Sequence, residues 1–256
     1  MMSFSANLGF LWTELSLPDA VRAAAAAGFD AVECHWPYET PADEVRAALD
    51  ETGLPMLGIN TVRGDVSASE NGLAALPGRR QEARAAIDQA LEYASVIGAQ
   101  AVHVMAGAAQ GASAHDAFVS NLSYACDHAG REGKTVLIEP LNPVDAPGYF
   151  LASTTQGAEL VESLDLPNLK LMFDCYHVGR AEGDVVTRMK RLLPMIGHVQ
   201  IASVPERGPP DRGELFYPAI FDALKELGWS QPIGAEYKPN GPTDPTLGWL
   251  RNVQPA

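Results

Sequence analysis

Val136-Leu137-Ile138-Glu139 is one of four short apolar runs in the second half of the chain that carry a side-chain oxygen donor at or near their end. The other three are Leu171-Met172-Phe173-Asp174, Val199-Gln200-Ile201 and Ile233-Gly234-Ala235-Glu236. The intervals between the four polar residues are 35, 26 and 36 residues, about one strand-plus-helix unit each. These four side chains would converge only if their strands lay side by side in a parallel sheet.

The rest of the chain repeats the same unit of a strand followed by a helix. Strands are predicted at residues 5–10, 31–34, 55–60, 101–105, 135–139, 169–174, 197–201 and 232–236. Helices are predicted at 18–27, between Pro41 and Gly53, and at 84–97, 114–130, 155–164, 184–193, 217–227 and 244–251. Eight alternating units in 256 residues predict an α/β fold, a single (β/α)8 TIM barrel domain spanning residues 1–256. An open doubly wound sheet would carry a glycine-rich phosphate turn after its first strand, and residues 7–12 do not supply one.

Composition limits the ligand and the compartment. The net charge of −14 argues against a protein that tracks nucleic-acid phosphates, so we expect a small ligand. No apolar run approaches the ~18 residues of a membrane span. The cysteines, Cys34, Cys126 and Cys175, are odd in number and without paired spacing, which predicts free thiols and a cytoplasmic protein. The oligomeric state stays open, a homo-oligomer included.

Residues 61–80 form a long connection rich in glycine and serine, with Leu73, Leu76 and Pro77 embedded in it. Loops of this length are uncommon in compact domains unless they cover a site. Two interpretations stand side by side: a lid that folds over a ligand, or a surface loop with its own small packing cluster.

The four strand-end residues Glu139, Asp174, Gln200 and Glu236 are predicted to hold a divalent metal ion. Two carboxylates about 4 Å apart repel by roughly 4 kcal/mol at an effective dielectric constant of 20, so three of them gathered together need a cation. An all-oxygen ligand set favours Mg²⁺ or Mn²⁺ over zinc. The alternative for any one of these carboxylates is a salt bridge or the capping of the following helix.

Three further polar residues follow the predicted ligands and are predicted to bind the substrate: His177, Arg207 and Lys238. Two cations beside a metal that acids already surround favour an anionic substrate, because they give its carboxylate a place to bind. The alternative is that Arg207 and Lys238 pair with Glu214 or Asp211.

The other histidines carry less information. His103 and His198 lie within predicted strands, where we expect hydrogen-bonded histidines inside the barrel. His35, His115 and His128 give no signal.

At these positions the sequence resembles the hydroxypyruvate isomerase family, which includes 2-oxo-tetronate isomerases and lies within the xylose-isomerase-like TIM barrels. The matching segments are Gly64-Asp65, residues 72–79, His103-Val104-Met105-Ala106-Gly107, residues 137–142, Phe173-Asp174-Cys175-Tyr176-His177, residues 198–202, Pro205-Glu206-Arg207, Gly213-Glu214 and residues 234–239. The most specific are residues 198–202 and 236–239, because related sugar epimerases typically place a histidine where this chain has Gln200. Gly208 and Gly179 depart from the family pattern.

The resemblance implies isomerisation of a small 2-oxo acid, either hydroxypyruvate to tartronate semialdehyde or 2-oxotetronate to 3-oxotetronate. It implies Glu139 and Glu236 as the acid/base pair and the same four residues as metal ligands. Proton transfer through an enediolate, with the metal holding the substrate oxygens, agrees with both the resemblance and the residue chemistry.

The main rival is a ketose 3-epimerase acting on neutral sugars, which would use the same barrel and paired glutamates. Lys238 and Gln200 argue against it. A DNA-repair nuclease would need a basic face and more metal-binding histidines. A non-catalytic binding protein for acidic sugars would not need both glutamates.

Overall fold

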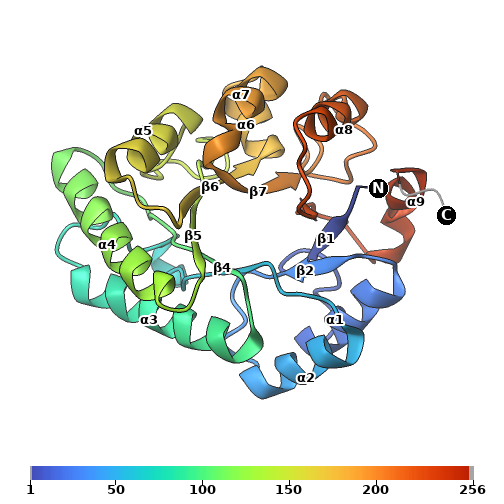
Figure 1. Ribbon diagram of the computed structural model, residues 1–256, viewed down its shortest axis with the longest axis horizontal. Coiled ribbons are helices and arrows are strands. Elements are labelled where there is room, and N and C mark those ends of the chain that lie inside the picture. Colours follow the sequence, from blue (N-terminus) through green and yellow to red (C-terminus); the bar gives the residue numbers. More distant parts are fainter. Residues whose placement is uncertain (1, 254–256) are drawn as a thin grey trace.

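The computed structural model describes residues 2–253, in which eight parallel strands form a barrel enclosed by helices (Figure 1). The strands are β1 (Phe4–Asn7), β2 (Ala31–Glu33), β3 (Gly58–Asn60), β4 (Ala101–His103), β5 (Thr135–Ile138), β6 (Leu169–Asp174), β7 (Ile196–Ile201) and β8 (Ile233–Ala235). Their order in the sheet is β2-β1-β8-β7-β6-β5-β4-β3. The Leu57 N–H donates to Val32 O at 2.8 Å and Cys34 N–H to Gly58 O at 3.1 Å, so β2 and β3 also meet. The predicted TIM barrel is confirmed.

The helices lie outside the barrel in chain order (Figure 1). They are α1 (Leu17–Ala26), α2 (Ala42–Thr52), α3 (Arg80–Ile97), α4 (Ala112–Gly130), α5 (Thr154–Leu164), α6 (Cys175–Ala181), α7 (Val185–Leu192), α8 (Tyr217–Glu226) and α9 (Gly248–Val253). Local sequence sets several of their ends: the Ser153 hydroxyl accepts the Gln156 N–H at the start of α5, and Gly53 ends α2 with a left-handed φ of 71°. No helix in the described part of the chain is both long and apolar enough to cross a bilayer.

Several elements differ from the prediction. The third strand begins at Gly58 and not at residue 55, and the last helix begins at Gly248 and not at residue 244. The first strand begins at Phe4 and ends at Asn7, because residues 8–15 turn at the mouth of the barrel instead of extending the strand. The short helix α6 was not predicted. It begins directly after Asp174, whose Oδ1 accepts the Tyr176 N–H at 2.8 Å.

The two faces of the sheet bury different chemistry. Outward side chains pack against helices; Phe4, for example, lies 5.7 Å from Phe221 and 5.2 Å from Trp249, ring centre to ring centre. Inward side chains include the buried polar residues Ser5, Glu33, His198 and Gln200. TIM barrels usually fill this space with bulky branched residues. The polar residues inside this barrel therefore indicate a functional site.

The amino-terminal end of the barrel interior is incompletely filled. A cavity of about 350 Å³ lies there, lined by small residues such as Gly58, Ala101 and Gly197 and reaching up to Glu33 and Gln200. Glu139, Asp174 and Glu236 lie at the opposite, carboxyl-terminal end of the strands.

Candidate active site

Three buried carboxylates meet where strands β5, β6 and β8 end. Glu139 follows β5, Asp174 is the last residue of β6 and Glu236 follows β8. Their exposed fractions are 5%, 1% and 4%. Glu139 and Glu236 line a cavity of about 130 Å³ together with His177 and Arg207. Parallel strands deliver their last residues to one edge of a sheet, which explains why positions almost a hundred residues apart converge.

Arg207 places a positive charge among these carboxylates. Its Nη2 donates a hydrogen bond to Glu236 Oε2 and lies 3.4 Å from Asp174 Oδ2. The guanidinium also lies over the rings of Phe10 and Tyr176, 4.9 and 5.0 Å from their centres. The alternative pairing of Arg207 with Glu214 or Asp211 is therefore not the arrangement of the structure.

Glu236 has two further partners that the sequence did not indicate. His35 Nε2 lies 2.8 Å from Glu236 Oε1, and Asn7 Nδ2 donates to the same oxygen at 3.0 Å. Asn7 is the last residue of β1. The predicted ligands on later strands were chosen because they lie at strand ends, so the same criterion would have identified Asn7. His35 lies in the loop after β2 and carries no comparable pattern.

The three carboxyl groups differ in their affinity for a proton. Burial, together with the charges of Glu236 and Asp174, raises the pKa of Glu139 well above its ordinary value. Burial also raises the pKa of Asp174, to about 7, against the opposing effect of Arg207. Burial would raise the pKa of Glu236 as well, but Arg207 and His35 outweigh it and the pKa is lowered. The three neighbouring carboxyl groups thus differ in basicity.

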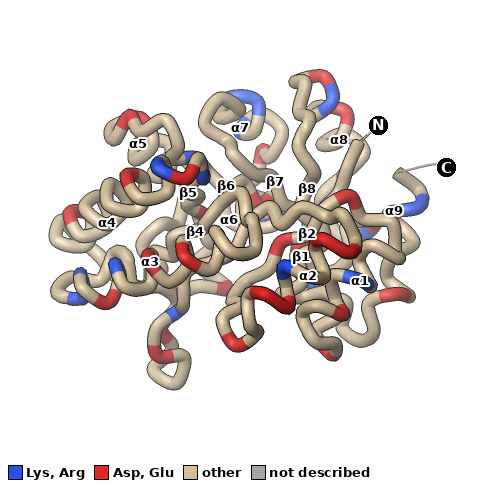
Figure 2. The backbone as a smooth tube through the Cα atoms, turned by 60° about the horizontal axis from the view of Figure 1, so that its bottom comes forward, with Lys and Arg blue, Asp and Glu red and all other residues tan. Residues whose placement is uncertain are grey.

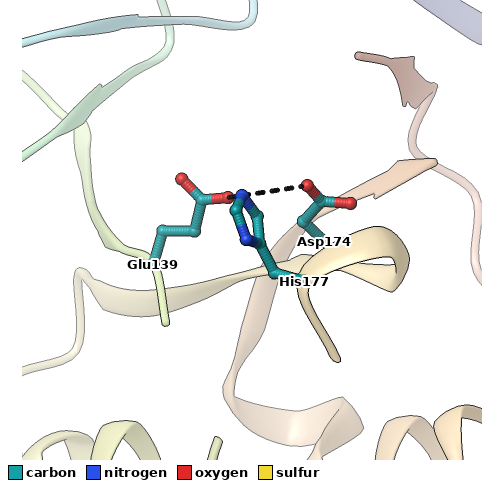
Figure 3. Close-up of side chains that lie close together, drawn as sticks. All are labelled: Glu139, Asp174 and His177. Atoms are coloured by element: carbon teal, nitrogen blue, oxygen red, sulfur yellow. Dashed lines mark ion pairs between the residues drawn. The ribbon is translucent and has the colours of Figure 1, made fainter. Parts of the chain in front are cut away.

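His177 faces both Glu139 and Asp174, as Figure 3 shows. Its Nε2 lies 3.8 Å from Glu139 Oε1 and 3.6 Å from Asp174 Oδ2, and one atom from each residue lies within 4.8 Å of the others. The backbone N–H of Asn142 donates to His177 Nδ1 at 3.0 Å. Burial lowers the pKa of His177 to about 3, so the ring is neutral at ordinary pH. A neutral ring that accepts at Nδ1 carries its proton on Nε2, and this tautomer donates a hydrogen bond but cannot ligate a metal through Nε2.

Gln200, on β7, sits deeper in the barrel. Its Nε2 donates to Glu33 Oε1 at 2.8 Å, and Glu33 also accepts from Asn7 Nδ2 at 3.0 Å. Glu33 Oε2 pairs with His198 Nε2. Gln200 is therefore joined to Glu236 through Glu33 and Asn7.

Two of the four predicted metal ligands have a side-chain oxygen that is available to a cation. Within residues 2–253, the Oε1 atoms of Glu139 and Gln200 are buried without a hydrogen-bond partner. Buried oxygens are nearly always paired, so each of these two atoms is available to a cation, whereas both oxygens of Asp174 and of Glu236 already have partners in the protein. Ionised Glu33 can only accept hydrogen bonds, so it turns the NH₂ of Gln200 toward itself and leaves the carbonyl oxygen free.

Lys238 lies at the rim of the cavity, away from the carboxylate cluster. Its side chain is exposed, and its Nζ lies 5.8 Å from the centre of the Phe10 ring, which Arg207 also contacts. Its backbone N–H donates to Arg207 O at 2.7 Å, which ties the two cationic residues together.

The two strand histidines behave differently. His198 has the buried partner that the sequence analysis expected, Glu33. The expectation for His103 is wrong: in the described part of the chain neither of its ring nitrogens has a hydrogen-bond partner, although the residue is only 2% exposed.

Comparisons with known proteins agree with this arrangement. A family model described as xylose isomerase-like TIM barrel matches residues 21–253. The 2-oxo-tetronate isomerase of Cupriavidus necator is 47% identical over 98% of both chains, and the putative hydroxypyruvate isomerase of Danio rerio is 44% identical over 98% of this chain and 95% of its own. The chain belongs to the hydroxypyruvate isomerase family of xylose isomerase-like TIM barrels. A crystal structure described as an AP endonuclease, family 2, from Brucella melitensis has a TM-score of 0.95 and 37% identity, covering 99% of this chain and 100% of that one.

In this member of the hydroxypyruvate isomerase family, the long loop after β3 has the small packing cluster that one of the two interpretations predicted. Leu73 is buried in a small cluster of its own with Ala83 and Ala86 of α3. Asn71 lines the cavity beside Glu139. The loop thus packs on α3 and at the same time contributes to the edge of the site.

Proposed function

We propose that the protein is an isomerase of small 2-oxo acids that bear a hydroxyl group on the next carbon. Its substrates would be hydroxypyruvate, converted to tartronate semialdehyde, or 2-oxotetronate, converted to 3-oxotetronate. The observation that carries this proposal is a small cavity that the buried side chains Glu139 and Glu236 line together with the cationic Arg207. The names of the relatives support the same reaction class.

The size of the cavity supports a small substrate. Pockets for drug-sized ligands have volumes from roughly 300 Å³ upward. The volume here, about 130 Å³, suits a molecule of three or four carbon atoms better than a hexose. The guanidinium of Arg207 matches a carboxylate, which a neutral ketose lacks.

We assign Mg²⁺ or Mn²⁺ to Glu139, Asp174, Gln200 and Glu236, because all four offer oxygen and two of them have buried unpaired oxygen atoms. Such an ion would supply a Lewis acid that polarises the substrate's carbonyl group.

The residues of the chain divide the remaining work. One glutamate carboxylate of the pair, Glu139 or Glu236, removes the proton from the hydroxyl-bearing carbon, and the electron pair of that C–H bond forms the enediolate. A proton from the pair then returns to the former carbonyl carbon, and the proton of the hydroxyl group passes to the former carbonyl oxygen, so no atom or electron is gained or lost. The Nε2–H of His177 points into the cavity as a hydrogen-bond donor for a substrate oxygen. Burial of both glutamates limits proton exchange with water between the two steps.

The carboxylate of the substrate takes no part in the proton transfers. We assign it to Arg207, with Lys238 at the rim adding a second positive charge. The thiols of Cys34, Cys126 and Cys175 are free and buried, which suits a reducing compartment, and we assign the enzyme to the cytoplasm.

An NMR time course tests this function. The protein is incubated with hydroxypyruvate, with 2-oxotetronate and with a neutral ketose, each with and without a chelator. We expect the aldehyde or 3-oxo product from at least one acid and loss of turnover with the chelator. Turnover of the ketose alone would replace the proposal with the 3-epimerase alternative. Cleavage of abasic-site DNA without isomerase activity would replace it with a nuclease.

Substitution of either glutamate tests the acid/base pair. We predict that Glu139→Gln and Glu236→Gln each lower kcat by at least roughly a hundredfold, because an amide cannot shuttle a proton. The matched control is Glu162→Gln on the exposed face of α5. Circular dichroism should show the same fold in all three variants. Near-normal turnover in either active-site variant would remove that glutamate from the mechanism.

A further inference from the structure

His103 is a buried histidine that none of the roles above uses. It is the last residue of β4, and its side chain lines the same cavity as Glu139, His177 and Arg207. Its Nδ1 lies 3.8 Å from Glu139 Oε2, beyond hydrogen-bond distance. Neither Nδ1 nor Nε2 has a hydrogen-bond partner among the described residues.

The other buried histidines of the barrel show that this is exceptional. His198 pairs with Glu33, His35 with Glu236, and His177 accepts the backbone N–H of Asn142. Buried polar side chains are almost always hydrogen-bonded, and an unpaired one that faces a cavity indicates a partner that arrives from outside. For His103 that partner is the molecule that fills the cavity.

The position of His103 also indicates which part of the substrate it meets. Arg207 is held near Asp174 and Glu236, so a substrate carboxylate bound to it lies toward β6 and β8. His103 lies on the other side of Glu139, on β4, which is the neighbour of β5 in the sheet. The atoms left for His103 are the hydroxyl and carbonyl oxygens of the two reacting carbons.

We propose that His103 contacts the substrate directly and donates a hydrogen bond to the oxygen that becomes charged in the enediolate. This inference rests on the proposed function and adds a catalytic residue to it. A neutral imidazole has one N–H donor and one nitrogen acceptor, which matches the carbonyl oxygen and the hydroxyl group of a 2-oxo-3-hydroxy acid. The hydrogen bond strengthens as negative charge grows on that oxygen, so it favours the transition state over the bound substrate.

The test is His103→Leu, which removes both ring nitrogens and introduces an apolar side chain of similar size. We expect kcat with the better of the two acids to fall by roughly 10²-fold to 10³-fold, as for loss of an oxyanion donor, while KM changes less than about threefold. The melting temperature should stay the same or rise, because the variant removes two buried polar atoms that have no partner. His103→Gln, which restores one N–H donor, should recover part of kcat.

The control is His115→Leu, at an exposed position in α4, and it should leave kcat unchanged. The proposal is overturned if His103→Leu keeps kcat within twofold of the wild type. It is also overturned if the variant loses melting temperature together with activity and His103→Gln rescues neither, since that pattern belongs to a structural histidine.

A binding measurement separates this inference from the proposed function. N-hydroxyoxamate, a planar anion that resembles an enediolate, is titrated calorimetrically into the wild type and into His103→Leu. If the wild type turns over neither acid, the proposed function fails, and weaker binding of this probe by the variant still supports the contact. Equal binding by both proteins, or none by the wild type, overturns it.

Discussion

Glu33 is the residue through which the polar interior of the barrel is held together. It is buried and accepts hydrogen bonds from Asn7, Gln200 and His198. Burial would raise the pKa of Glu33, but the charge and hydrogen bond of His198 outweigh it and lower the pKa below 4.5. Burial likewise opposes the charge on His198, and Glu33 raises the pKa of that histidine above 6.5. The pair is therefore ionised over a wide range of pH.

We predict that Glu33→Gln lowers the free energy of unfolding by about 3–5 kcal/mol, the usual result of breaking a buried ion pair. The loss should be largest between pH 4.5 and pH 6.5. These limits are the ordinary pKa values of a glutamate and a histidine, and between them both groups are mostly charged in the unfolded chain as well. It should shrink as the pH falls through the lowered pKa of Glu33, and again as it rises through the raised pKa of His198. Urea unfolding across this range, with Glu162→Gln as control, measures it. A difference independent of pH would mean that the pair is not ionised.

Lys238 differs from Arg207 because its ammonium is exposed. We predict that Lys238→Met raises KM for a 2-oxo acid by roughly twofold to fivefold, the range of a solvent-exposed ion pair, and changes kcat less. Added salt should reduce the difference between the two proteins. The control is Lys225→Met at an exposed position in α8. If neither KM nor kcat changes, the lysine serves structure only.

At the scale of elements, apolar runs were sufficient to predict every strand of the barrel and most helices. They could not predict α6, because no loop separates this helix from β6. Asp174 is both the last residue of the strand and the N-cap of the helix. Asp174 thus has both contacts of the alternative interpretation: Oδ1 caps a helix, and Oδ2 pairs with His177 and Arg207. Its role as a metal ligand stays a prediction.

The part of the site that lies at strand ends could also be predicted from the apolar runs. A residue at the end of a strand is visible in the sequence because the apolar run before it is visible. The contacts of Glu33 and His35 depend on which strands close the barrel, since these residues of the second unit meet side chains of β7 and of the segment after β8. The hydrophobic pattern within one segment does not indicate which distant segment it will contact. The unpaired state of His103 is likewise a property of its surroundings and not of its strand.

The loop after β3 offers a test at this scale. Gly72 has φ of +112°, and a Cβ at this position would lie 2.6 Å from the Met105 backbone carbonyl. Gly78, in the same loop, also has positive φ, at +81°, but a Cβ there would meet nothing within 4 Å. We predict that Gly72→Ala displaces the loop, lowers stability by more than the ~1–3 kcal/mol of backbone strain, and raises KM because the adjacent Asn71 leaves the cavity. Gly78→Ala is the matched control and should show the strain alone. Equal losses in the two variants would contradict a close fit between the loop and Met105.

At the scale of the whole molecule, acidic residues are spread over the outer helices and loops, and cationic ones are fewer (Figure 2). With a net charge of −14, the surface as a whole repels an anionic substrate. The positive charge that the proposed substrate needs is therefore local, supplied by Arg207 and Lys238 at the mouth.

Metal binding should also be measurable as a property of the whole fold, because the proposed ligands come from strands β5 to β8, half of the barrel. A ligand that binds only the folded state stabilises it by roughly 2.7 kcal/mol at a hundred times its dissociation constant. For a chain of this size, we predict that Mn²⁺ at that excess raises the melting temperature by roughly 5–10 °C, and that a chelator reverses the rise. Asp174→Asn should weaken the effect, and the exposed control Glu162→Gln should keep it. Mn²⁺ that leaves the melting temperature of the wild type unchanged would show that the four oxygen donors do not form a metal site.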